Sequence, residues 1–352
     1  MSSGSRLRAA IASNAALPTV WPVAVIVLLS VGCGAGVAAA LGYADVALSA
    51  GFVAALATVG GVLVPPALTT QVALPAGVAV ALAPPLALAG EGRPVVAALV
   101  AAVVFAVTAL AQQDEPTGRL VGALGGTAYV LAVGLGLVRD APLSHTFVAG
   151  AVGLGTAAAL IVGVAALRAR REEPGDAPDR LPGRFATRLG AAIATALRER
   201  QHNQWARLAV RRVVVLVPMV AVLEAWRDPV ALYALVVAFS VTQPVASDTV
   251  DRALARVAGV VAAVLVTGAV GLVAPDWAVI AFGVVAMVAG LAYLLRSPFL
   301  TTLGTTVLTV AGSVVSGSSS AVTGRLVSTL AGAAVGLLAS VLIRGAPPPP
   351  SG

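Results

Sequence analysis

Two long and almost wholly apolar regions flank one charged stretch, and this division constrains the fold more than any other feature of the chain. The charged stretch covers residues 168–212 and holds eleven of the 22 basic residues. Its charges would lose their hydration inside a bilayer, so the stretch must lie in water. We therefore expect it to separate two membrane-embedded halves and to set the orientation of both.

The composition supports a membrane location. Hydrophobic residues make up 59% of the chain and charged residues only 11%, whereas soluble domains are roughly 45–50% apolar. All basic residues are Arg, and the net charge of +7 fits the positive-inside bias of membrane proteins better than binding to nucleic acid. The single cysteine, Cys33, excludes a disulfide framework and a cysteine-based metal site.

Twelve apolar runs of roughly bilayer-spanning length follow one another, separated by residues typical of turns. They cover residues 21–41, 46–64, 72–89, 94–111, 119–138 and 146–167 in the first half and residues 208–225, 229–245, 252–273, 276–295, 298–315 and 322–343 in the second. Three prolines, Pro75, Pro84 and Pro85, predict a kinked or partly re-entrant segment in the third run. The sequence thus predicts an all-α polytopic membrane protein of about 12 transmembrane helices in two six-helix halves.

The expected domain organisation follows from these runs. It consists of a cytoplasmic N-terminus (1–20), a first membrane half (21–167), a basic cytoplasmic linker (168–207), a second membrane half (208–343) and a disordered proline-rich tail (344–352). This topology places 18 of the 22 Arg residues on the cytoplasmic side and four outside. We therefore expect both termini to lie in the cytoplasm, with the protein in the plasma membrane of a bacterium.

A basic amphipathic helix is predicted within the linker, after a flexible polar loop over 174–182. Apolar residues recur every fourth position, and the basic residues lie outside this stripe; the apolar residues are Phe185, Leu189, Ile193 and Leu197. Such a helix can lie on the anionic inner leaflet or on the protein's own cytoplasmic face. Recruitment of a partner is the alternative role.

A candidate substrate gate follows the predicted span that ends at Gln243 and Pro244. Arg252 and Arg256 are four residues apart, so they share one face of the next helix close to the membrane boundary. One interpretation is a positive gate that attracts an organic anion, and the other is snorkelling of both side chains to lipid phosphates. We expect Gln243, Asp248 and Thr249 to shape the turn, with Ser247 or Asp248 capping the helix.

A stripe of hydroxyl residues runs along the predicted span over 298–315. The spacing alternates between four and three residues, which places all of them on one helical face; the residues are Thr302, Thr306, Thr309, Ser313, Ser316 and Ser320. The hydroxyls can serve helix packing by bonding to backbone carbonyls. Alternatively, they line a polar path for a substrate.

Several motifs resemble those of the FUSC (fusaric acid resistance, aromatic acid exporter-like) family. The similarity lies in the Gln243-Pro244 break followed by an Asp-Thr pair and two spaced arginines, in the helix with Arg325, Thr329 and Gly332, and in the segment 124–129. It is best over residues 207–343. The resemblance implies a membrane transporter that exports aromatic acids, and it adds Arg325 and Thr329 to the candidate substrate path. The chain departs from the family in its linker of only about 40 residues, and in having Val260 where a threonine is usual.

The leading functional hypothesis is an integral membrane transporter that exports small organic anions, among them aromatic carboxylates. Its expected partners are the lipid bilayer, the anion and a second copy of the chain. The alternative is a non-transporting scaffold or accessory protein that recruits partners through the basic linker, and a channel is a weaker third hypothesis. The sequence has no acidic residue or histidine at the middle of a run, no Walker loop and no metalloprotease motif. We therefore expect no enzymatic activity, no cofactor and no metal.

Overall fold

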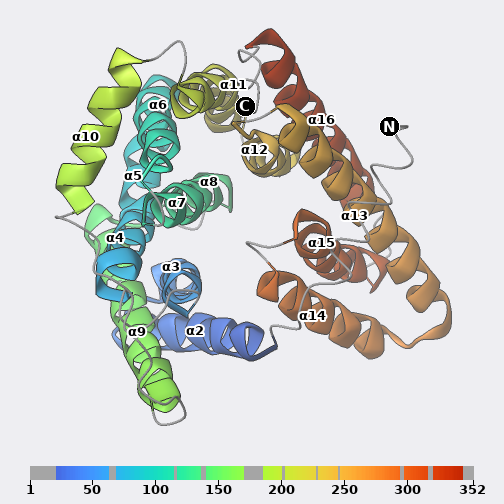
Figure 1. Ribbon diagram of the computed structural model, residues 1–352. Helices are drawn as coiled ribbons and strands as arrows, with labels where there is room; N and C mark the ends of the chain where they lie inside the picture. Colours follow the sequence, from blue (N-terminus) through green and yellow to red (C-terminus); the bar gives the residue numbers. More distant parts are fainter. Residues whose placement is uncertain are drawn as a thin grey trace. The chain divides into compact units, whose positions relative to one another are not determined.

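The computed structural model describes residues 21–62, 69–114, 117–135, 140–169, 185–199, 203–226, 229–244, 246–293, 297–315 and 320–343, and every regular element among them is a helix (Figure 1). The predicted all-α membrane fold is confirmed. The expected N-terminal segment, the polar loop over 174–182, the proline-rich tail and the position of Ser316 lie outside these residues.

The chain forms two compact units. The N-terminal unit holds the described residues from 26 to 226, and the C-terminal unit holds those from 229 to 343 together with residues 21–25. The first unit contains α2 (Trp21–Ala40, in large part), the 3-10 turn η1 (Ala44–Val46), α3 (Ala47–Val62), α4 (Thr69–Ala81), α5 (Ala83–Gly90), α6 (Pro94–Ala111), α7 (Thr117–Leu120), the π-helix η3 (Val121–Gly125), α8 (Gly126–Leu135), α9 (Leu143–Ala169), α10 (Phe185–Arg198) and α11 (Gln204–Trp226). The second unit contains α12 (Pro229–Val241), α13 (Ala246–Val273), α14 (Asp276–Ala292), α15 (Pro298–Val315) and α16 (Ser320–Leu342).

Eight helices of the described residues are long and apolar enough to cross a membrane. They are 22–40, 44–62, 72–90, 94–111, 143–166, 247–273, 298–315 and 322–342. The expectation of 12 spans in two six-helix halves is therefore wrong for this part of the chain. The protein is a multi-pass membrane protein, and the eight helices supply its candidate spans.

Four of the twelve expected spans are not among the eight candidate membrane spans, for three physical reasons. The apolar helical segments 231–241 and 276–290 are shorter than a bilayer requires. In the N-terminal unit, α11 is long enough, but its first half carries Arg207, Arg211 and Arg212. The run over 119–138 is divided into α7, η3 and α8.

Close helix contacts explain the irregular backbone of this divided run. A Cβ atom added at Gly122 would collide with the backbone carbonyl of Thr108, and one added at Gly118 would collide with that of Ala111. These glycines let the start of the run lie directly against the end of α6. A π-helix is a local departure from α-helical pairing that adapts a helix to such a contact.

The predicted break in the third run is present. Leu82 separates α4 from α5, and Pro84 and Pro85 lie in the first turn of α5, where a missing backbone N–H costs no helical hydrogen bond. Pro75, in contrast, lies inside α4. The structure thus accommodates two of the three prolines by starting a new helix.

In the C-terminal unit, α13 packs on α15 and α16, α12 packs on α16, and α14 packs on α15. The α14–α15 contact is made between backbones, because a Cβ added at Gly290 would lie 3.0 Å from the Cα of Gly304. Gly332 provides the equivalent close approach of α16 to the backbone of α12 at Ala234. Small residues therefore set the spacing of this helix bundle.

Candidate anion-binding site

The candidate site lies where α13 and α16 pack on α15. A Cβ added at Gly259 of α13 would lie 2.9 Å from the backbone oxygen of Phe299 and 3.2 Å from the Cβ of Thr302. The glycine thus brings α13 into backbone contact with α15, one turn from Arg256. Because of this contact, the Arg256 side chain can reach the hydroxyl stripe of α15.

Arg256 contacts that stripe at Thr302. Its Nη1 donates a hydrogen bond to the Thr302 Oγ1 at 3.1 Å. The Arg256 Nε is buried and donates to no group in the part of the chain that the structure describes. A guanidinium always carries its charge in a protein, so this side chain combines a full positive charge with an unused donor.

Arg325 approaches the same stripe from α16. Its Nε lies 3.4 Å from the Oγ1 of Thr306, and its Cζ lies 4.2 Å from the centre of the Tyr233 ring on α12. Only 6% of the residue is exposed. The aromatic face attracts the guanidinium through its quadrupole but supplies no negative charge.

The two contacts are neighbours on one helix face. Thr302 and Thr306 are four residues apart, so their hydroxyls lie about 6 Å apart along α15. Arg256 and Arg325 are close enough to repel each other electrostatically. The site therefore brings two like charges together on hydroxyl groups.

Arg252, one turn before Arg256, completes the basic cluster in a different environment. It is exposed, and Asp248 on the same helix attracts it. For Arg256 and Arg325, no carboxylate of the described residues lies within ion-pair distance. The charge of Arg252 is thus partly balanced, while those of Arg256 and Arg325 are not.

Three predicted residues lie at the turn before α13. The backbone N–H of Gln243 donates to the Thr249 Oγ1 at 3.2 Å, which ties the end of α12 to the first turn of α13. The Gln243 side-chain amide donates to the carbonyls of Ser240 and Thr242. Asp248 lies in the first turn of α13, where a negative charge is favourable for the helix dipole. These residues shape the turn between α12 and α13.

The remaining hydroxyls of the predicted path bond to their own helices. Thr309 donates to the carbonyl of Thr305, Ser313 to that of Thr309, and Thr329 to that of Arg325. The structure therefore brings together Arg252, Arg256, Thr302, Thr306 and Arg325. Tyr233 joins them although no sequence pattern pointed to it, because its role depends on the packing of α12 against α16.

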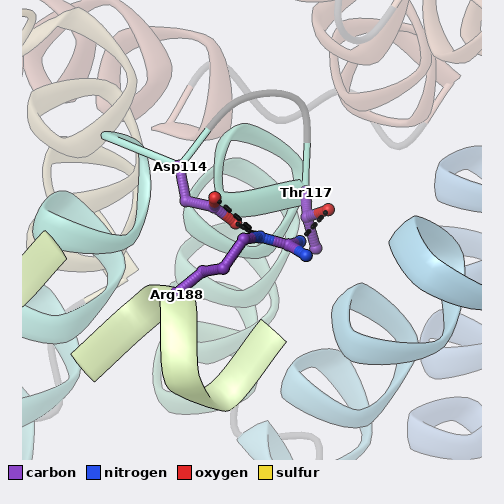
Figure 2. Close-up of polar contacts among 3 residues, drawn as sticks. All are labelled: Asp114, Thr117 and Arg188. Carbon is purple, nitrogen blue, oxygen red and sulfur yellow. Dashed lines mark hydrogen bonds and ion pairs between the residues drawn. The ribbon is translucent and has the colours of Figure 1, made fainter. Parts of the chain in front are cut away.

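The half-buried Arg188 has a different kind of partner. In the N-terminal unit, the Arg188 Nε of α10 donates to both carboxylate oxygens of Asp114, at 3.0 and 3.3 Å, and its Nη2 donates to the Thr117 Oγ1 at 3.2 Å (Figure 2). The Arg188 side chain is 17% exposed and that of Asp114 is 12% exposed. This pair is an ordinary neutralised ion pair, and it holds α10 against the connection between α6 and α7.

Comparison with known families adds an independent observation. Residues 217–339 match the family described as fusaric acid resistance protein-like. This segment, here called the FUSC-like domain, is similar to that family, and it contains every residue of the candidate site. No curated protein and no solved structure matches the chain.

Proposed function

We propose that the protein is a membrane transporter that exports small organic anions, including aromatic carboxylates, and that Arg256 and Arg325 bind the anion. The observation that carries this proposal is a pair of positive charges on helices of membrane-spanning length, whose polar and aromatic partners among the described residues are two hydroxyls and one ring. Ionisable side chains are rare inside spans, and there they mark ion and substrate pathways. The FUSC-like domain supports the same function.

Partial burial of Arg256 and burial of Arg325 carry a desolvation free energy that a bound anion would offset. Removing a cation from water costs several kcal/mol even after the protein relaxes, and a neutral hydroxyl returns only a part of that. A carboxylate would offer charge-assisted, bidentate hydrogen bonds to a guanidinium, including the unused Nε of Arg256. The exposed Arg252 adds a positive charge near the turn, where it attracts anions towards the pair.

The test is transport by the purified protein in liposomes. A labelled aromatic acid such as 4-hydroxybenzoate is loaded on one side, and its movement is followed for the wild type, for Arg256→Gln and for Arg325→Gln. We expect each variant to lose at least about tenfold in transport rate at low substrate concentration, since a charge-assisted hydrogen bond contributes about 1.5–3 kcal/mol. Arg198→Gln, which removes an exposed charge of α10, serves as the matched control. Unchanged transport by both site variants would refute the proposed binding site.

The orientation of the protein is part of the proposal. The bias of Arg residues supports a cytoplasmic location of α10 and of both termini. Reporter fusions after Arg198 and at each terminus test it in bacterial cells. A fusion after Arg198 that reports a location outside the cytoplasm would reverse the proposed direction from which the anion reaches Arg252.

The scaffold hypothesis has less support. Ile193 and Ala196 of α10 pack against α6 and α11, and Arg188 is paired with Asp114. The apolar face that would recruit a partner is therefore partly covered by the protein's own N-terminal unit. We retain the transporter as the proposed function.

A further inference from the structure

The charges at the candidate site specify more than an anion. Arg256 and Arg325 together carry two positive charges, and no carboxylate of the described helices lies within ion-pair distance of either. Their hydrogen-bond partners, Thr302 and Thr306, are consecutive along one face of α15. A single carboxylate bound at one guanidinium would leave the other charge unbalanced.

We propose that the site binds a dianion, with one anionic group on Arg256 and the other on Arg325. This inference rests on the proposed function and narrows it to organic molecules that carry two negative charges about one helical turn apart, such as dicarboxylates. The hydroxyls of Thr302 and Thr306 hold the two guanidiniums in place when the anion is absent. They are neutral, so a ligand can displace them without breaking an ion pair.

The geometry of the two arginines suits this ligand. Arg256 comes from α13 and Arg325 from α16, so the two guanidiniums reach the stripe from different helices that both pack on α15. Tyr233 lies against Arg325 and restricts it, since a ring 4.2 Å from the Cζ occupies one face of the planar group. The edges of the guanidinium, which carry its N–H groups, are the parts that hydrogen-bond in the plane to a carboxylate. Neighbouring like charges favour a dianion because each guanidinium attracts both anionic groups.

The experiment compares ligands that differ by one charge. Isophthalate and its monomethyl ester share one ring and nearly one shape, but at neutral pH the first is a dianion and the second a monoanion. Succinate and monomethyl succinate form the same pair on an aliphatic chain. The dissociation constant of each ligand is measured by calorimetry with the full-length protein in detergent.

We expect the dianion to bind at least about tenfold more tightly than its monoester in one or both pairs, because the second charge meets its own guanidinium. In Arg256→Gln and in Arg325→Gln, this preference should fall to about onefold, with the monoester losing less affinity than the diacid. Arg256→Lys keeps the charge and should keep a preference for the dianion. Arg198→Gln should leave the preference unchanged.

The outcomes separate this inference from the proposed function. If monoesters bind as tightly as diacids in both pairs while 4-hydroxybenzoate is transported in an Arg256-dependent way, the dianion inference is wrong and the proposed function stands. If none of the ligands binds and no aromatic acid is transported, both are wrong. A preference for the dianion that persists in Arg256→Gln and Arg325→Gln would place the dianion site elsewhere. Size-exclusion chromatography of each variant confirms that it is folded.

Discussion

Arg325 is buried, and Arg188 of α10 and Arg256 are half-buried, but the partners of these three arginines differ in charge. Arg188 donates to a carboxylate that neutralises it. The pair in the FUSC-like domain donates to threonine hydroxyls, and its aromatic neighbour is neutral. A cation with a fixed counter-ion is already neutralised, whereas under the proposed function one without it would be neutralised by a bound anion. The comparison teaches that the two regions stabilise their arginines differently, one with a carboxylate and the other with neutral groups.

The largest effect on stability should come from removing the counter-ion of Arg188. Asp114→Ala leaves a cation that is 17% exposed without its carboxylate, and breaking such a pair costs about 2–3 kcal/mol in the free energy of unfolding. The measurement is unfolding by SDS in mixed micelles. The double variant Asp114→Ala with Arg188→Ala should recover part of the loss. A single variant as stable as the wild type would show that Asp114 does not stabilise this helix contact.

The second effect tests how the pair is positioned. Gly259→Ala places a methyl group 2.9 Å from a backbone oxygen of α15, so α13 must move away and carry Arg256 from Thr302. We expect a loss of about 1–3 kcal/mol in stability together with weaker anion binding. Gly268→Ala on the same helix is the matched control, since nothing lies within 4 Å of its added Cβ. Equal behaviour of the two variants would contradict the close contact.

Removing an arginine without a carboxylate partner among the described residues should increase the free energy of unfolding, whereas the two previous changes decrease it. Arg256→Met keeps much of the side-chain volume but removes a cation that has no carboxylate partner among the described residues, so we expect the protein to become more stable by about 1 kcal/mol while it loses anion transport. Unfolding and transport are measured on the same preparation. A destabilised Arg256→Met would mean that Arg256, like Arg188, serves the fold.

The smallest effect concerns the ring beside Arg325. Tyr233→Leu should weaken anion binding by about 0.5–1 kcal/mol, since the cation–π contact that orients the guanidinium is lost. Tyr233→Phe keeps the aromatic face and should bind nearly as well as the wild type. Calorimetric affinities of the two variants provide the check, and equal losses would point to the tyrosine hydroxyl instead of the ring.

The sequence predicts the membrane class and the all-helical fold well, because both follow from long apolar runs. It overestimates the number of spans where tertiary contacts change a run, as at Gly118 and Gly122, whose lack of a side chain admits the end of α6. Hydropathy also does not reveal that α11 groups with the N-terminal unit, although the sequence pattern assigned it to the second half.

The candidate site was predictable in part. The spacing of Arg252 and Arg256 placed them on one helical face, and the resemblance pointed to Arg325. The stripe over 302–313 left two interpretations open, and the structure divides it: Thr302 and Thr306 accept hydrogen bonds from arginines, while Thr309 and Ser313 bond to their own helix. No local sequence pattern could distinguish the first two hydroxyl residues from the last two, because the difference arises from which helices cross α15. The role of each residue in transport stays a prediction.

The backbone contact between Gly290 and Gly304 has a mechanical consequence. Helices whose side chains interdigitate resist axial sliding, since each ridge must leave its groove. At this point α14 and α15 meet with no side chain from either glycine between them, so a small shift along their axes requires no ridge to disengage there. Such a shift is of the shear type. It would move Thr302 and Thr306 together relative to α14, and the resistance to this movement would come from the side-chain contacts on either side of the two glycines.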